Sequence, residues 1–257
     1  ARGVVALLTP AENPTAEPEL SLLMPPDVNL LTARMYAPAS EMSARLRAYE
    51  TRLEEWLAPF GDAPLDAVAF ACTGSTYLLG PSRRRPEALK RRHGPCPVVC
   101  AADALKDGLQ SLRAQRITLV SPYPSALTEA AQDHWRAAGY EVAAVIQSPL
   151  AHGAAHPIYG QTAATLLTGL RQGLKAGAAD AVIVMGTGAP SLAALAIASE
   201  ETDIPILSSN LATAWSVARQ LGLEERPLIT DWLAPDAPWR ARLGSRFPAI
   251  HARLKGA

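Results

Sequence analysis

The sequence predicts an α/β fold in which two pseudo-symmetric lobes, each a doubly wound parallel sheet, enclose a site in the cleft between them. Residues 67–71 form a continuous apolar run, typical of a strand buried on both faces, which stops abruptly at Cys72-Thr73-Gly74-Ser75. Strand-like and helix-like segments alternate along the chain, which favours parallel sheets covered by helices. Similar segments recur in the same order in the second half, which indicates an internal duplication.

The first half contains the elements of one lobe. An apolar strand over residues 3–8 ends at Thr9-Pro10, and a polar loop over residues 11–18 follows. We expect Ser40 to cap a helix over residues 41–57, because apolar residues recur there at helical spacing: Met42, Leu46, Tyr49, Leu53 and Trp56. The strand that ends at Cys72 comes next, followed by a brief strand over residues 97–100 and a helix over residues 102–113.

Three segments of the second half match the first. Residues 116–120 end in Ser121-Pro122 as the first strand ends in Thr9-Pro10, and residues 204–210 parallel residues 96–102. Residues 180–188 parallel residues 66–74, with Gly186 in the place of Cys72. Because α/β sheets bind ligands at the carboxyl ends of their strands, we expect the Cys72 and Gly186 loops to face each other across one cleft.

The duplication predicts a first lobe over residues 1–114 and a second over residues 115–215, with residues 216–257 packing back on the first. Tryptophans in helical patterns are expected in the core or at an interface; these are Trp56, Trp135 and Trp215. For the oligomeric state, a homodimer is the common default.

Charge and hydropathy exclude several partners. Lys plus Arg equals Asp plus Glu at 24 each in 257 residues, so no global field favours nucleic acid or an anionic membrane. The basic run at 83–85 and 90–92 is interrupted by Pro86 and lacks aromatics, as expected for a solvated loop and helix face. No apolar run reaches the length of a membrane span and no signal-type start is present, so we expect a cytoplasmic protein without a membrane or nucleic-acid partner.

Cys72 is the candidate reactive residue. Glycine and hydroxyl residues follow it at the strand end, so backbone N–H groups and a helix N-terminus can favour a thiolate or a bound carboxylate there. The alternative is inert packing, since free cysteine is among the most buried residue types.

Neither the cysteines nor the histidines indicate a metal. Cys72, Cys96 and Cys100 lack zinc spacing, and their odd number without a secretory signal argues against a disulfide framework. His152 and His156 bracket a short loop, but no third ligand is apparent, so we interpret them as solvated.

Several segments carry a family resemblance: TPAENPTAEPEL at residues 9–20, ACTGS around Cys72, SPY ending in Tyr123, DAVIVMGTG at residues 180–188 and PILSSN at residues 205–210. Over residues 4–220 the chain resembles the aspartate/glutamate racemase superfamily, and within it the branch of maleate cis–trans isomerase and arylmalonate decarboxylase. The resemblance implies two α/β lobes around a site that uses no cofactor or metal and takes a small dicarboxylate.

The resemblance also implies roles for individual residues. Asn13 matches a carboxylate-binding asparagine, Cys72 the first-lobe cysteine that is the nucleophile in the isomerase, and Tyr123 a tyrosine that hydrogen-bonds a substrate carboxylate. In the two matching loops, Thr73, Gly74, Thr187 and Gly188 match residues that cradle carboxylate or enediolate oxygens. Ser75 and Gly186 of the same loops complete the expected substrate-binding residues. Asn13 also suits an ordinary turn, and residues 208–210 suit a helix cap.

The chain departs from this pattern at Gly186. The racemases and maleate isomerase have a second cysteine at that position, and arylmalonate decarboxylase keeps a cysteine only there. A second asparagine of the isomerase is also missing, and its region offers His156 as a minor replacement.

Three hypotheses therefore share one site. A Cys72 thiolate can add to the alkene of a cis diacid, allow rotation and leave. A neutral Cys72 thiol can instead protonate the enediolate left by decarboxylation of a malonate. A third hypothesis is a carboxylate-binding protein without catalysis.

Overall fold

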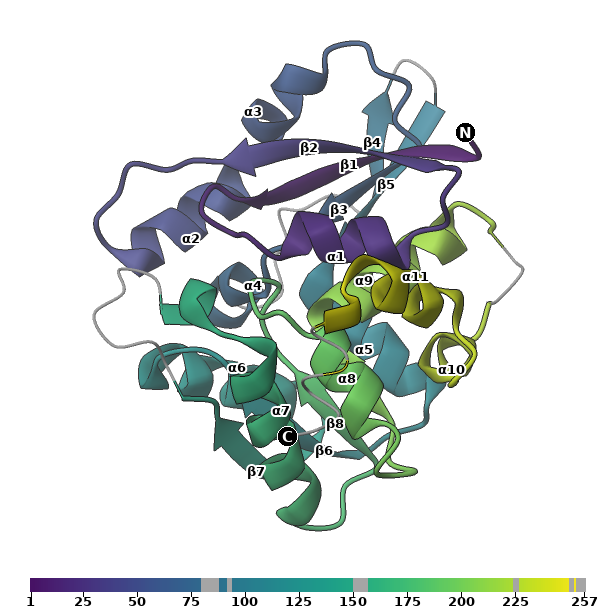
Figure 1. Ribbon diagram of the computed structural model, residues 1–257. Coiled ribbons are helices and arrows are strands. Elements are labelled where there is room, and N and C mark those ends of the chain that lie inside the picture. The colour runs from purple at the N-terminus through teal and green to yellow at the C-terminus, as the bar shows by residue number, and fades with distance from the viewer. Residues whose placement is uncertain (80–87, 92–93, 150–156, 224–226, 250–251, 253–257) are drawn as a thin grey trace.

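The computed structural model describes residues 1–79, 88–91, 94–149, 157–223, 227–249 and 252. Within this part of the chain two sheets lie one above the other in Figure 1, the first purple to teal and the second teal to green. The first has the strand order β2-β1-β3-β5-β4 and the second the order β7-β6-β8-β9. Every described strand pair is parallel except β4 with β5, so the predicted two-lobed α/β fold is confirmed.

The strands of the first sheet are β1 (Gly3–Pro10), β2 (Val28–Met35), β3 (Ala67–Phe70), β4 (Ala88–Arg91) and β5 (Gly94–Cys100). Those of the second are β6 (Arg116–Ser121), β7 (Glu141–Gln147), β8 (Ala181–Val184) and β9 (Ile206–Ser208).

The described helices are α1 (Ala16–Leu23), α2 (Met42–Thr51), α3 (Leu53–Leu57), α4 (Thr73–Leu79), α5 (Ala101–Ser111), α6 (Ser125–Ala137), α7 (Ala163–Lys175), α8 (Leu192–Ala198), α9 (Ser209–Gln220), α10 (Ile229–Leu233) and α11 (Pro238–Arg246). Two short 3₁₀ turns, η1 (Ala58–Phe60) and η2 (Pro157–Gly160), complete the set. None of the helices in the described residues is long and apolar enough to cross a membrane.

The strand registers confirm the internal duplication. Leu8 of β1 pairs with Phe70 of β3, and the matching residue Val120 of β6 pairs with Val184 of β8. On the other side, the pairing of β3 with β5 is repeated by that of β8 with β9 at corresponding residues. The segments matched in the sequence therefore occupy equivalent places in the two sheets.

The duplicated aspartates carry equivalent hydrogen bonds. Asp66 Oδ2 accepts a bond from the backbone N–H of Val4 at 2.8 Å, at the start of β1. Asp180 Oδ2 accepts bonds from the N–H groups of Gln115 and Arg116, both at 2.8 Å, at the start of β6. Each carboxylate thus joins the first strand of its lobe to the strand that follows the aspartate, which is β3 in the first lobe and β8 in the second.

Several local predictions were wrong. The polar loop was predicted to extend to residue 18, but α1 begins at Ala16. The first turn of α1 carries acidic residues, which the helix dipole favours at that end. Strand β2 was not predicted, since an edge strand is half exposed and shows no continuous apolar run. The helix over residues 41–57 is broken at Arg52 into α2 and α3, and Glu41 rather than Ser40 occupies the N-cap of α2.

The basic segment also differs from its prediction. Lys90 and Arg91 lie on β4, an antiparallel edge strand, and not on a helix. Residues 83–85 and residue 92 lie outside the described residues.

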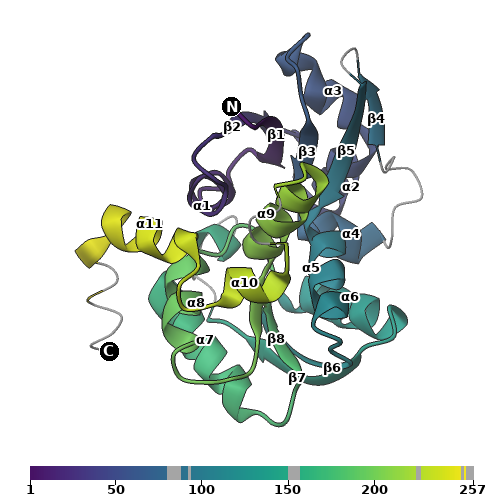
Figure 2. The same cartoon turned by 90° about the vertical axis from the view of Figure 1, so that its right-hand side faces the viewer.

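Helices α5 and α9 connect the two lobes. These helices follow β5 and β9, and they pack against each other. Helix α9 contacts β3 and β5 of the first sheet, whereas α5 contacts β9 of the second, and Figure 2 shows α9 beside β3. Trp215 of α9 and Trp135 of α6 are fully buried, and Trp56 is half-buried.

Helix α11 contacts both lobes. It packs against α1 of the first and α8 of the second, and the Arg242 guanidinium donates to the carbonyls of Leu22 and Leu23 at the end of α1. The lobe boundaries at residues 114 and 215 remain a prediction.

The buried carboxylate of Glu19 connects α1 with the second lobe. It accepts hydrogen bonds from the Ser191 hydroxyl at 2.7 Å, the Leu192 N–H at 2.9 Å and the Asn210 amide at 2.8 Å. These donors lie at the starts of α8 and α9, so one acidic group satisfies polar groups from two helices of the other lobe. Burial raises the pKa of Glu19, although these hydrogen bonds act in the opposite direction.

Glu19→Ala should lower the free energy of unfolding by about 3 kcal/mol or more, because it leaves three buried donors without their acceptor. Urea denaturation followed by tryptophan fluorescence measures the change. The matched control is Glu17→Ala on the same helix, which removes a half-exposed ion pair with Arg34 and should cost about 1 kcal/mol or less. Equal losses for the two variants would show that the Glu19 contacts do not stabilise the fold.

Candidate active site

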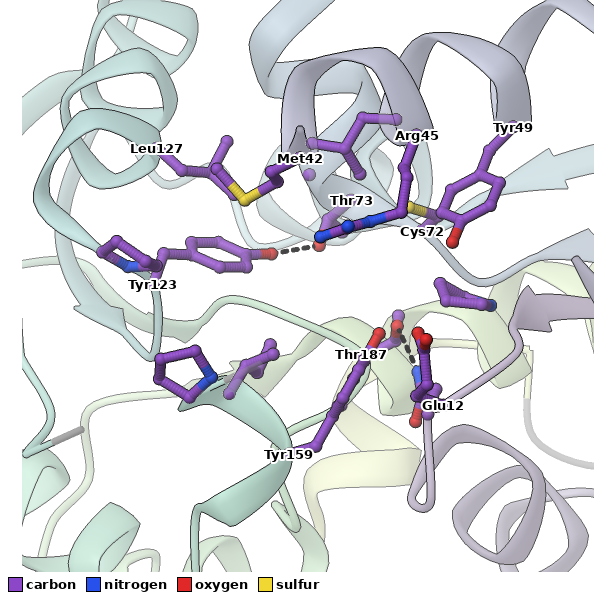
Figure 3. A pocket seen from close by; sticks show the side chains of 18 of the residues that line it. Glu12, Met42, Arg45, Tyr49, Cys72, Thr73, Tyr123, Leu127, Tyr159 and Thr187 are labelled. Carbon is purple, nitrogen blue, oxygen red and sulfur yellow. Dashed lines mark hydrogen bonds between the residues drawn. The ribbon is translucent and has the colours of Figure 1, made fainter. Parts of the chain in front are cut away.

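A cavity of about 360 Å³ lies between the lobes, at the carboxyl ends of β1, β3 and β6. Figure 3 shows Cys72, Thr73, Arg45 and Tyr49 along one wall, and Thr187, Glu12 and Tyr159 along the facing wall. Seven of the residues predicted for the site line this cavity: Asn13, Cys72, Thr73, Gly74, Tyr123, Thr187 and Gly188. Ser75 and Gly186 do not line it, although both lie in the loops that carry lining residues.

Cys72 lies two residues after the end of β3 and directly before the first residue of α4. Its side chain is buried, and the Ser75 hydroxyl donates to the Cys72 carbonyl at 3.0 Å. The pKa of the Cys72 thiol is raised to about 11, chiefly by burial and to a smaller extent by the charges of Glu50 and Cys100, while hydrogen bonds from Ser75 act in the opposite direction. The thiol is therefore neutral at pH 7, whereas the strand-end position alone suggested a setting that favours a thiolate.

Tyr123 brings a phenol from the second lobe to the Cys72 loop. Its hydroxyl and the Thr73 hydroxyl are 2.5 Å apart, so the two are hydrogen-bonded across the cleft. The Tyr123 carbonyl accepts a bond from the Gln147 amide at 2.7 Å, which holds the loop after β6 in place. Burial raises the pKa of Tyr123 well above its usual value, so the phenol stays protonated and can donate.

Asn13 combines a turn role with a place in the cavity wall. Its side-chain oxygen accepts bonds from the N–H groups of Thr15 and Ala16, at 2.9 and 3.0 Å, where α1 begins. Its amide nitrogen donates to the Thr187 hydroxyl at 3.1 Å, and that hydroxyl donates to the Ala71 carbonyl at 2.8 Å. The Asn13 side chain thus forms the predicted turn and also lines the cavity.

Gly186 occupies a position that only glycine fits. Its φ is +85°, in the left-handed region, and a Cβ there would lie 2.8 Å from Ile158 Cδ1 and 2.9 Å from Pro122 Cγ. At Gly188 a Cβ would lie 2.7 Å from the ring of Tyr159. A cysteine in place of Gly186 therefore requires both backbone strain and movement of its neighbours.

Five polar residues of the cavity were not predicted for the site from the sequence: Glu12, Ser40, Arg45, Tyr49 and Tyr159. The apolar spacing at residues 42–56 predicted a helix but not what its face contacts; the face that carries Met42, Leu46 and Tyr49 borders the cavity, and Arg45 lies on it. Tyr159 lies in η2, a turn that no pattern predicted, and burial raises its pKa.

The expected capping role of residues 208–210 is confirmed in part. The Ser208 hydroxyl accepts the N–H of Leu211 and caps α9, whereas the Asn210 amide binds Glu19 and the carbonyl of Thr187. Asn210 thus supports the loop that carries Thr187. No group of three metal-ligating side chains occurs among the described residues, and His152 and His156 lie outside them.

Two duplicated α/β lobes with a thiol, hydroxyls and an amide in the cavity between them are the arrangement that the resemblance to the aspartate/glutamate racemase superfamily predicts. The chain belongs to the arylmalonate decarboxylase family, whose model matches residues 57–231. The family resemblance predicted from the sequence is thus confirmed.

Similar proteins are found in both branches of this group. The chain is 24% identical to a maleate isomerase of Geobacillus stearothermophilus over 86% of its length and 92% of the relative. The structure resembles that of the maleate isomerase Iso from Pseudomonas putida with a TM-score of 0.70 and 23% identity, covering 86% of this chain and 93% of the other. It resembles arylmalonate decarboxylase with a TM-score of 0.62 and 15% identity, covering 85% and 92%.

Gly186→Ala should lower the free energy of unfolding by about 2–4 kcal/mol, because a Cβ adds left-handed strain and a steric clash. The control is Gly222→Ala, where φ is +65° but no atom lies within 4 Å of the added Cβ, so that only the strain is felt. Thermal and urea unfolding of both variants separates the two contributions. Losses of the same size would mean that packing around Gly186 tolerates a side chain.

Proposed function

We propose that this protein isomerises a small cis dicarboxylate without a cofactor, with Cys72 as the nucleophile. The observation that carries the proposal is the convergence of the Cys72 thiol with neutral hydrogen-bond donors from both lobes on one cavity. Such donors suit a small dicarboxylate substrate, because negative charge develops on one of its carboxylates during the reaction and hydrogen bonds stabilise that charge.

The chemistry follows from the positions of these groups. The thiol first gives its proton to solvent water, and the thiolate then adds to one alkene carbon, so that the electron pair of the double bond moves into the carboxylate on the neighbouring carbon. The resulting enediolate is stabilised by the second N–H of the Asn13 amide and by whichever hydroxyl of the Thr73–Tyr123 pair does not donate to the other. Rotation about the new single bond and departure of the thiolate give the trans diacid and regenerate Cys72.

Relatives support a covalent route. The structural neighbours include a maleate cis–trans isomerase of Nocardia farcinica in which a cysteine mutant carries a covalently bound succinylcysteine intermediate. The chain covers 92% of the Geobacillus maleate isomerase and is equally similar to a maleate isomerase of Pseudomonas putida, at 24% identity.

Decarboxylation of a malonate is the second candidate, and the state of the thiol favours it. A pKa of about 11 keeps Cys72 protonated at neutral pH, as a proton donor requires and a nucleophile does not. Loss of CO₂ from a malonate leaves an enediolate of the same kind, the S–H proton then passes to its α-carbon, and the thiolate regains a proton from solvent water. The apolar part of the wall, Met42, Leu46, Leu127 and Ile158, suits a substituent on that carbon.

The expected partner of the protein is this small dicarboxylate. The cavity of about 360 Å³ has the liquid volume of about twelve water molecules, each of which has one heavy atom. A four-carbon diacid has eight heavy atoms, so the cavity leaves room for a substituent. A homodimer remains a prediction, to be measured by light scattering.

Cys72→Ser should abolish isomerisation of maleate, because a serine hydroxyl is a far weaker nucleophile at neutral pH. With the wild-type protein, intact mass spectrometry after incubation with maleate should find a succinyl adduct that maps to Cys72. The control is Cys100→Ser, which removes another buried thiol that does not line the cavity.

An unmodified protein that converts phenylmalonate instead would refute the isomerase and support decarboxylation. If neither acid is converted while both still bind, the chain is a carboxylate-binding protein, and both enzymatic proposals fail.

The pH dependence separates the two reactions independently. At pH 7, about four units below the pKa of Cys72, roughly one thiol in ten thousand is ionised. If the thiolate attacks, kcat/KM for maleate should rise about tenfold per pH unit from pH 7 to 10. If the thiol donates a proton, kcat/KM for a malonate should stay level over this range and fall only as pH approaches 11.

The cavity tyrosines do not confuse this measurement. Burial raises the pKa of Tyr49 to about 12, and the pKa values of Tyr123 and Tyr159 are also raised, so these phenols keep their protons from pH 7 to 10. A flat profile for maleate would contradict a rate-limiting supply of thiolate.

A further inference from the structure

Helix α2 presents one of its faces to the cavity. Met42, Arg45, Leu46 and Tyr49 are spaced three and four residues apart, which places them on the same side of the helix, and all four line the cavity. The apolar residues Met42 and Leu46 share this face with Arg45 and Tyr49, and Figure 3 shows Arg45 and Tyr49 on the same wall as Cys72.

Arg45 is held in position by the segment before α2. Its Nη1 donates to the carbonyl of Ala39 at 2.8 Å and to the carbonyl of Ser40 at 3.0 Å. The side chain is half-buried, so that its guanidinium is positioned rather than freely solvated. Burial raises the pKa of Tyr49, and the charge of Arg45 acts in the opposite direction, as expected for a cation close to that phenol.

Arg45 supplies a positive charge to the cavity. Within the described part of the lining, Arg45 carries the only cationic side chain, whereas Glu12 adds a negative charge. The donors around Cys72 are neutral: the Asn13 amide and the hydroxyls of Thr73 and Tyr123. A dicarboxylate brings two negative charges, and these neutral donors supply no positive charge to balance either of them.

We propose that Arg45 binds the second carboxylate of the substrate and thereby selects dicarboxylates over monocarboxylates. A guanidinium matches a carboxylate with two parallel N–H donors and stays charged at every working pH. The inference rests on the proposed function for the class of substrate, but it concerns binding and does not depend on which reaction follows.

The test compares the binding of succinate and butyrate, which share a four-carbon chain but carry two carboxylates and one. Neither acid has a double bond or a malonate group, so isothermal titration measures binding without turnover. Arg45→Gln should weaken succinate binding by roughly tenfold to a hundredfold and change butyrate binding by about twofold or less. Arg45→Lys, which keeps the charge but lacks the two-pronged donor, should fall between Arg45→Gln and the wild type for succinate.

The matched control is Arg47→Gln, which removes the same charge from an exposed position of α2 that does not line the cavity. Succinate binding should be unchanged in this variant. Equal loss of succinate and butyrate binding in Arg45→Gln, or no loss of either, would overturn the inference. If the wild type binds succinate through Arg45 but converts neither maleate nor phenylmalonate, the proposed reactions fail while the role of Arg45 stands.

Discussion

Hydrogen bonds between loops of opposite lobes are the constraint on which the site depends. Thr187, after β8, binds Asn13 and the Ala71 carbonyl of the first lobe, and the Thr15 hydroxyl donates to the carbonyl of Gly188 at 2.9 Å. These bonds hold the ends of β1, β3 and β8 at fixed separations. Because the same loops line the cavity, the contacts that join the lobes also position the groups that face a substrate. Glu19 and Asn210 support this arrangement from behind.

The two lobes are equivalent in their strands but not in their chemistry. The thiol of Cys72 stands at the end of β3, whereas Gly186 stands at the equivalent position after β8, where Ile158, Pro122 and the Tyr123 hydroxyl fill the space of a side chain. At this pair of equivalent positions, the first lobe supplies a side chain that can donate or accept a proton and the second lobe does not. This one-sided arrangement suits a reaction that forms an enediolate and needs a single thiol, whether as nucleophile or as acid.

Burial has opposite consequences for the groups of the cavity. It keeps the phenol of Tyr123 protonated and able to donate, which favours stabilisation of developing negative charge. The same burial disfavours the thiolate of Cys72, which isomerisation requires. Burial therefore strengthens the hydrogen bonds of the cavity but opposes ionisation of the thiol, and the balance between these effects separates the two candidate reactions. A guanidinium on α2 adds positive charge to a wall that otherwise offers neutral donors and apolar groups.

The sequence by itself determined the two-lobed fold, the equivalence of the strand ends and the place of Cys72, because buried parallel strands and repeated segments leave local patterns. Edge strands such as β2 left no such pattern, since one side of them is solvated. Only the tertiary structure brought together Glu19, Ser191 and Asn210, and it placed Arg45 on the cavity wall. The protonation of Cys72 was likewise decided there, because desolvation depends on every segment packed around the sulfur and not on its neighbours in the chain.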